Sequence, residues 1–156
     1  MSKLEFDRSS HGVQLFDHAG VALTPRFDAY NFVDSHSRGP WPDGTYAYAG
    51  YNAHAEVADP ESEYGSYGIL YFSVPARIGM GVHSGRRNIP DGLGRYGPEH
   101  CTLGCIRTTD EAMAVFVEAV RRDPLESIGV VTLAASAEFA VRKTAARIGK
   151  ARRRSP

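Results

Sequence analysis

Glycine and proline are concentrated in the part of the chain that precedes Cys105, and they limit what that part can fold into. The sequence of 156 residues has 16 glycines and 9 prolines, most of them before this cysteine. Short runs rich in aromatic and β-branched side chains lie between these turn-forming residues, a composition typical of strands. A chain of this length usually forms one domain. We therefore expect a single, mostly β domain across residues 1–156, with its core between about residues 12 and 133.

Six segments have the side-chain pattern of strands. They comprise residues 12–17, 28–33, 45–51, 67–74, 78–83 and 127–134. The turn-forming residues 18–20 predict a hairpin after the first of these strands. Residues 34–42 have the composition of a loop, and the polar, acidic residues 52–66 predict an exposed connection.

The chain changes character after Cys105, where the pattern favours a helix. Thr108 and Glu111 have the spacing of a capping box, which predicts Thr108 as the N-cap. Pro124 limits how far this helix can extend. The apolar residues that share one face of the helix are Met113, Phe116, Val117 and Val120. Alanine and arginine dominate residues 137–154, where we expect a C-terminal helix.

The formal net charge is zero, but its distribution is uneven. Residues 142–154 hold seven of the 18 basic side chains and no acidic one, so we expect a solvated basic tail over residues 142–156. No aromatic side chain is interleaved with these charges, which argues against a nucleic acid partner. The amino-terminal residues lack the apolar segment of a secretory signal, and no run approaches the ~18 apolar residues of a membrane span.

Residues 78–110 contain the side chains with the clearest chemical potential. A thiol attacks as its thiolate, so a nucleophilic cysteine needs a base, and His83 is the candidate base for Cys105. The backbone carbonyl of Ser84 is a candidate to orient the imidazole. We expect the N-terminus of the predicted helix and a protonated His83 to favour the Cys105 thiolate. Gly104 permits a tight turn, and the N–H groups of Gly104 and Cys105 are candidate donors to an oxyanion.

The same stretch resembles the catalytic domain of the L,D-transpeptidases of the YkuD type. The signature of that family is a histidine, a spacer, Ser/Thr-His-Gly-Cys, a hydrophobic residue and then Arg or Asn. The resemblance rests on His83, on residues 102–107 (Thr-Leu-Gly-Cys-Ile-Arg) and on the turn at residues 39–46 (Gly-Pro-Trp-Pro-Asp-Gly-Thr-Tyr). It covers roughly residues 12–133.

The resemblance implies a β-sandwich-like catalytic domain and an acyl transfer on the tetrapeptide stems of peptidoglycan. Cys105 would attack the carbonyl of the third residue, a diamino acid, and expel the terminal D-alanine. An amine would then resolve the thioacyl-enzyme by crosslinking or by exchange with a free D-amino acid, whereas water would give L,D-carboxypeptidase activity. Arg107 is a candidate to bind a substrate carboxylate or to shape the Cys105 loop, and Thr102 stands at the Ser/Thr position of the signature. No metal or cofactor is implied.

Two features depart from the family pattern. Leu103 stands where the signature has its second histidine, and the spacer from His83 to Thr102 has 18 residues. The resemblance extends to a branch of secreted antibacterial effectors, including type VI effectors, that also lack this histidine. Together with the missing signal peptide, this predicts a protein made in the cytoplasm that acts in the periplasm or cell wall of a target bacterium. Its partners would then include a secretion-machine component and a cognate immunity protein.

Three other interpretations stay open. One is a zinc site, although Cys-x3-Cys is not a usual ligand spacing; its ligands would be His83, His100, Cys101 and Cys105. Another is that His100 replaces the absent family histidine while Cys101 is a small buried apolar residue. The third is a non-catalytic wall-binding groove, whose aromatic residues would otherwise form the core and cleft wall: Trp41, Tyr46, Tyr48, Tyr51, Tyr64, Tyr67 and Tyr71.

Overall fold

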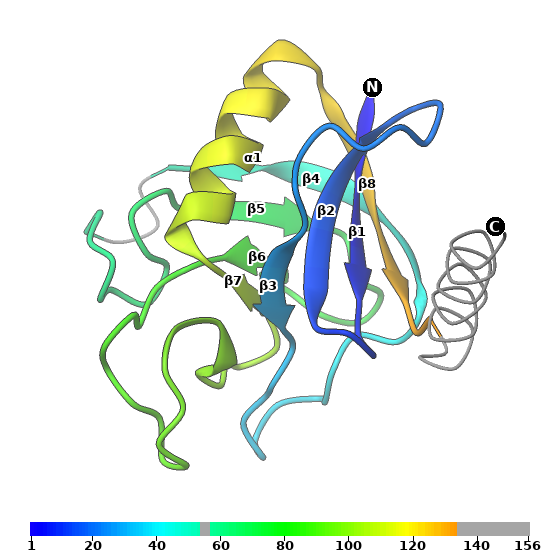
Figure 1. The fold of residues 1–156 in the computed structure, drawn as a ribbon. Coiled ribbons are helices and arrows are strands. Elements are labelled where there is room, and N and C mark those ends of the chain that lie inside the picture. Colours follow the sequence, from blue (N-terminus) through cyan, green and yellow to red (C-terminus); the bar gives the residue numbers. More distant parts are fainter. Residues whose placement is uncertain (54–56, 134–156) are drawn as a thin grey trace, which may run out of the picture.

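The computed structural model describes residues 1–53 and 57–133, in which eight strands close into one barrel. The strands are β1 (Ser2–Asp7), β2 (Gly12–Asp17), β3 (Phe27–Tyr30), β4 (Gly44–Asn52), β5 (Ile69–Phe72), β6 (Gly81–His83), β7 (Ile106–Thr108) and β8 (Leu125–Val131). Their order around the barrel is β1-β2-β3-β7-β6-β5-β4-β8, with parallel pairing of β1 with β8 and of β6 with β7. Figure 1 shows the main helix, α1 (Asp110–Arg122), beside this barrel. The mostly-β fold with one main helix is confirmed.

The first strand, β1, was missing from the sequence-based prediction, which placed the start of the core near residue 12. Leu4 and Phe6 point into the barrel and are buried, whereas Lys3 and Glu5 alternate with them. β1 pairs antiparallel with β2 and parallel with β8, so it closes the barrel. The high proportion of polar residues at the amino terminus concealed this two-residue alternation.

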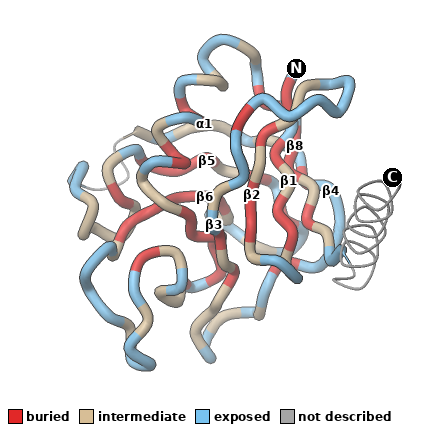
Figure 2. The backbone as a smooth tube through the Cα atoms, viewed as in Figure 1, coloured by how far each residue is buried: buried red, intermediate tan, exposed pale blue. Residues whose placement is uncertain are grey.

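The core is built from inward-facing strand residues and one face of α1. Figure 2 shows that the buried segments follow the strands, while most connecting loops are exposed. Met113, Phe116 and Val117 of α1 are buried, and the ring of Phe116 meets Phe27 edge to face at a centroid distance of 5.6 Å. Val120 is partly buried against the same cluster, so the predicted apolar face is the one that packs.

The short strand β7 replaces the expected loop before the helix, and it moves the helix cap by one residue. Thr108 belongs to β7, where it lies opposite Ala29 and its hydroxyl donates to the Asp28 carbonyl at 2.7 Å. Thr109 is the N-cap, because its hydroxyl accepts from the N–H of Ala112 at 3.1 Å. The predicted Thr108 cap is therefore wrong: the pairing of β7 with β3 already uses that residue.

Two long connections shape the surroundings of β6 and β7. Residues 57–68 lead from β4 to β5, and residues 84–105 lead from β6 to β7, extending away from the barrel in Figure 1 and including the short 3₁₀ helix η1 (Gly97–Glu99). The predicted C-terminal helix and basic tail lie outside the described residues. No helix within the described part of the chain is long and apolar enough to cross a membrane.

Candidate active site

Strand pairing brings the candidate nucleophile and the candidate base to the same face of the barrel wall. Val82 of β6 pairs with Ile106 of β7, and both side chains point into the core. His83 pairs with Arg107 in the same register, so these side chains point outward. Cys105 directly precedes β7 and lies two residues from Arg107, so it shares this outward face. Cys105 is thus the loop residue immediately before the strand that pairs with the strand of His83.

A network of backbone and side-chain hydrogen bonds holds the loop that carries Cys105. The Thr102 hydroxyl donates to the carbonyl of Cys105 at 2.7 Å and accepts from the N–H of Gly104 at 3.1 Å. The Gly104 carbonyl accepts from Asn31 Nδ2 at 2.9 Å and from Trp41 Nε1 at 2.7 Å. Thr102 therefore shapes the loop. Since the Gly104 N–H is already bonded, the Cys105 N–H is the better candidate for an oxyanion donor.

Gly104 is at a position that few other residues could occupy. Its φ of +143° is unfavourable for residues with a side chain, and a Cβ added there would lie 2.8 Å from the Met80 sulfur. Trp41, which anchors the same loop from residues 34–42, is fully buried. The loop at residues 34–42 therefore turns one aromatic ring inward, and that ring belongs to the core rather than to a wall-binding surface.

His83 is buried and held in one tautomer. Its Nδ1 lies 2.8 Å from the carbonyl oxygen of Ser84, which can only accept, so Nδ1 carries the proton and Nε2 keeps a free lone pair. Burial, followed by the positive charge of Arg107, lowers the pKa of His83 to about 3, against weaker opposing effects of Ser84 and Glu63. The imidazole is therefore neutral near pH 7, so the prediction of a protonated His83 is wrong.

The thiol of Cys105 is also neutral at rest. Its Sγ donates to the carbonyl of Gly79 at 3.4 Å, and the side chain is largely buried. Burial raises the pKa of the thiol to about 11, although a backbone hydrogen bond from Gly81 and the charge of Arg107 lower it. The prediction that the N-terminus of α1 favours the Cys105 thiolate is wrong as well. β7 separates Cys105 from Asp110, and a helix dipole acts only near its first turn.

Arg107 binds the loop that carries Glu63. It is completely buried, and its Nη1 donates to the carbonyl of Glu63 at 3.2 Å while Nη2 lies 3.5 Å from Glu63 Oε1. Arg86 holds the other carboxylate oxygen at 2.6 Å. Burial raises the pKa of Glu63, but the Arg86 hydrogen bond and the two arginine charges outweigh it and leave the pKa lowered. These contacts fix Arg107 to the segment that carries Glu63, and not to the Cys105 loop that the sequence suggested it would shape.

Ser84 contributes its two polar groups to different tasks. Its carbonyl meets His83, as the sequence suggested, whereas its hydroxyl donates to the Asp110 carboxylate. Asp110 also accepts from the N–H and hydroxyl of Ser66, at 3.1 and 2.6 Å. Sequence reasoning missed Glu63, Asn31 and the Ser66–Asp110 pair, because each acts from a distant segment that only the fold brings near.

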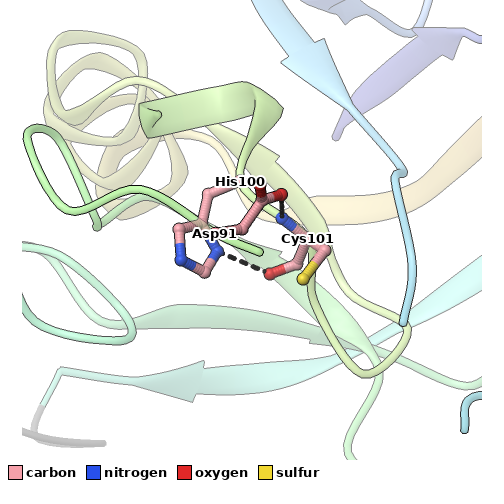
Figure 3. A group of neighbouring side chains, drawn as sticks. All are labelled: Asp91, His100 and Cys101. Atoms are coloured by element: carbon pink, nitrogen blue, oxygen red, sulfur yellow. Dashed lines mark hydrogen bonds between the residues drawn. The ribbon is translucent and has the colours of Figure 1, made fainter. Parts of the chain in front are cut away.

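The described residues contain one group of side chains with the spacing of metal ligands: Asp91, His100 and Cys101 (Figure 3). Their ligand atoms lie within 4.8 Å of one another. The group includes neither His83 nor Cys105, so the zinc set expected from the sequence is not assembled. His100 directs its Nδ1 to the carbonyl of Cys101 at 2.8 Å.

The Asp91 carboxylate is already saturated by hydrogen bonds. Oδ1 accepts from the N–H groups of Leu93 and Arg95 at 2.8 and 3.0 Å, and Oδ2 accepts from Arg95 Nε at 2.8 Å and from the Cys101 N–H at 3.0 Å. Burial raises the pKa of Asp91, but these donors outweigh it and hold the pKa well below its ordinary value. Four donors fill the four lone-pair directions, so Asp91 organises the loop rather than offering a metal ligand.

A groove of about 320 Å³ flanks the loop of Cys105 and is called the basic groove below. It lies between residues 36–38 and residues 76–80, and its lining includes His36, Arg38, Arg77, Ile78, Met80 and Leu103. Leu103 is 74% exposed at its edge. The residue that replaces the family histidine is therefore part of a groove wall.

Comparisons with known proteins identify the fold. No protein-family model matches the sequence, and no curated protein matches it. The solved L,D-transpeptidase (Yku) from Stackebrandtia nassauensis has a TM-score of 0.55 and 10% identity, over 86% of this chain and 57% of that one. Bd1075 from Bdellovibrio bacteriovorus has a TM-score of 0.56 and 11% identity, over 96% of this chain and 55% of that one. The fold is L,D-transpeptidase-like, and the chain spans little more than half the length of either protein.

Proposed function

We propose that this chain is a cysteine acyltransferase of the L,D-transpeptidase kind that acts on peptidoglycan tetrapeptide stems. The observation that carries the proposal is the neutral His83, fixed by Ser84 with Nε2 free, on the same face of the barrel as Cys105. The likeness in fold to a solved L,D-transpeptidase supports it. The proposed set consists of Cys105, His83 and Ser84 for catalysis, of Gly104 and Thr102 for shaping the nucleophile loop, and of Arg107 for anchoring the segment that carries Glu63.

The first half-reaction needs base assistance because the resting thiol is protonated. His83 Nε2 takes the proton of Cys105 as the sulfur attacks the carbonyl of the diamino acid. The Cys105 N–H donates to the oxyanion of the tetrahedral intermediate. Collapse breaks the peptide bond, and the departing D-alanine amine takes the proton from the imidazolium. A thioacyl-enzyme and a neutral His83 remain.

The second half-reaction uses the same base. His83 removes a proton from the incoming acceptor, which attacks the thioester and releases the Cys105 sulfur. A stem amine gives a crosslink, a free D-amino acid gives exchange, and water gives carboxypeptidase activity. The imidazolium then returns its proton to the departing Cys105 sulfur, so the free thiol and the neutral His83 are restored.

A direct assay tests the proposal with purified protein, a disaccharide tetrapeptide and free D-methionine, with products measured by mass spectrometry. We expect loss of D-alanine with the wild type, and a loss of at least about 10³-fold in Cys105→Ala and His83→Gln. Cys101→Ala is the matched control and should keep its activity. Tetrapeptide binding without turnover in both the wild type and Cys105→Ala would instead support a non-catalytic wall-binding module.

The same proposal places the activity at the cell wall, with a secretion-machine component and an immunity protein as partners. Expression directed to a host periplasm should then slow growth and change the stem composition, whereas cytoplasmic expression should not. The Cys105→Ala protein, directed to the same compartment, separates enzymatic damage from the burden of expression. Growth inhibition from cytoplasmic expression alone would contradict a wall target.

A further inference from the structure

We propose that the basic groove binds a single amino acid, the D-alanine that leaves or the free D-amino acid that replaces it, through its carboxylate and its side chain. This inference rests on the proposed function and names the part of the substrate that this groove takes. Arg38 and Arg77 would hold the carboxylate, and Ile78, Met80 and Leu103 would contact the side chain.

The position of the groove next to the nucleophile suits such a ligand. The Cys105 Sγ lies 3.4 Å from the Gly79 carbonyl, and the neighbours of Gly79 in sequence, Ile78 and Met80, both line the groove. Met80 also packs against Gly104. The Cα of a leaving residue lies only about 3.8 Å from the Cα of the residue that is attacked. A leaving amino acid must therefore occupy space near Sγ, and the groove is lined by Leu103, two residues from Cys105, and by both neighbours of Gly79.

The charge of the groove is positive and held in place. Arg38 Nη1 donates to the Ala76 carbonyl at 2.5 Å, and Arg77 Nη1 donates to the Gly39 carbonyl at 2.6 Å. Arg77 Nη2 also donates to the carbonyls of Arg38 and Pro40, at 3.2 and 3.3 Å. Neither arginine forms an ion pair with a carboxylate in the described part of the chain. Backbone carbonyls thus orient two guanidinium groups without neutralising them, an arrangement suited to an incoming carboxylate.

The remaining wall is apolar and sets the preferred side chain. Ile78 is 96% exposed, and Leu103 is exposed at the opposite edge. The volume of about 320 Å³ lies at the lower end of the roughly 300–1,000 Å³ of small-molecule pockets, and it exceeds what a methyl group needs. We therefore expect free D-methionine or D-leucine to be a better acceptor than D-aspartate.

A binding experiment tests the groove without chemistry. The probes are N-acetyl-D-methionine and its uncharged amide, titrated into isotope-labelled Cys105→Ala protein and followed by NMR. We expect the carboxylate form to bind at least about tenfold more tightly than the amide and to shift the side-chain resonances of Arg38 and Arg77. Arg38→Gln should remove this difference, whereas Arg87→Gln, outside the groove, should keep it. Equal binding of both probes, or shifts only elsewhere, overturns the inference.

A kinetic experiment completes the test. The wild type should prefer the tetrapeptide over its C-terminal amide, and Arg38→Gln should raise the KM for the tetrapeptide and for D-methionine about tenfold and abolish the preference. Arg38 is chosen because it makes one of the loop contacts, whereas Arg77 makes three. If the binding test succeeds but the wild type has no turnover, the proposed function is wrong, whereas the inference that the basic groove binds an amino acid is retained. If the wild type is active but shows no preference for the tetrapeptide over its amide, only the inference about the basic groove is wrong.

Discussion

The two sides of Cys105 differ in whether their arginine side chains are paired with a carboxylate. On one side, Glu63 pairs with Arg107 and with Arg86; Arg107 is fully buried, and the Glu63 side chain is 35% exposed. On the other side, Arg38 and Arg77 are oriented by backbone carbonyls and have no carboxylate partner in the described residues. The first is called the closed side here, and the second is the basic groove.

The difference follows from what each side has to do chemically. On the closed side, burial together with Arg107 keeps the resting His83 neutral and able to accept a proton, and the same burial makes it a weaker base than an imidazole with a pKa near 7. A groove that exchanges ligands must instead stay open to solvent, where a guanidinium keeps its charge at little cost. In the proposed function, desolvation keeps the base neutral on one side of Cys105, and accessible charge would select the ligand on the other.

The strongest test of the closed side is Glu63→Ala. It leaves the fully buried Arg107 without its carboxylate, but Glu63 is 35% exposed and its carbonyl contact to Arg107 remains, so we expect a loss of roughly 1.5–3 kcal/mol in the free energy of unfolding. Glu111→Ala is the matched control, because it removes a glutamate from an exposed pair with Arg87, where the cost is about 0–1 kcal/mol. Urea unfolding followed by circular dichroism measures both. Equal effects would mean that the closed side is not held by its ion pair.

Gly104→Ala tests the wall shared by the nucleophile loop and the basic groove. The positive φ and the close approach of Met80 predict a loss of roughly 1–3 kcal/mol in the free energy of unfolding. Gly92→Ala is the control, because a Cβ there meets nothing and its φ is ordinary, so we expect little change. Activity should fall in Gly104→Ala by more than stability explains, since Cys105 is displaced with the loop. A stable and fully active Gly104→Ala protein would contradict this packing.

The pH dependence of stability measures the burial of His83. Its pKa is 6.5 when exposed and about 3 in the fold, so between these values the unfolded chain binds more protons than the folded one. Stability should therefore be complete above about pH 6.5 and be lost as the pH falls, with a slope that approaches about 1.4 kcal/mol per pH unit. His83→Gln should remove this contribution. An NMR titration of the imidazole with a midpoint near 6.5 would show instead that the closed side admits water.

How far the sequence predicted this fold depends on the length and pattern of each element. β5 and α1 were found because they combine apolar periodicity with clear ends at Pro75 and Pro124. β1 was missed because its polar residues dominate the composition of its surroundings, and β7 because three residues are too few to show a period. Missing β7 then placed the helix cap one residue early.

Some features of the candidate site could also be predicted from the sequence, whereas others depend on the fold. The motif around Cys105 predicted a nucleophile and a base in short, recognisable stretches, and the pairing of β6 with β7 brings those stretches together. The protonation states were predicted wrongly, since burial of His83 and Cys105 depends on loops that pack over them from elsewhere in the chain. Leu103 was noted for the histidine it replaces, but its place in a groove wall could only come from the fold.

Leu103→His gives the smallest expected change in stability and tests what that position contributes. The side chain is 74% exposed, so the free energy of unfolding should change by less than about 0.5 kcal/mol. Losing an apolar contact in the basic groove should reduce the preference for D-methionine over D-serine as acceptor by roughly three- to tenfold. The ratio of the two exchange rates, measured in competition, reports this directly.

Leu93→His is the control for Leu103→His, because Leu93 is similarly exposed but lies outside the basic groove. A lower D-methionine preference in Leu103→His alone assigns position 103 to ligand selection. If Leu103→His instead raised turnover equally for every acceptor, the added imidazole would be acting on the nucleophile or the oxyanion. Leu103 would then not contribute to ligand selection, and the proposed selectivity of the basic groove would depend on Arg38 and Arg77 alone.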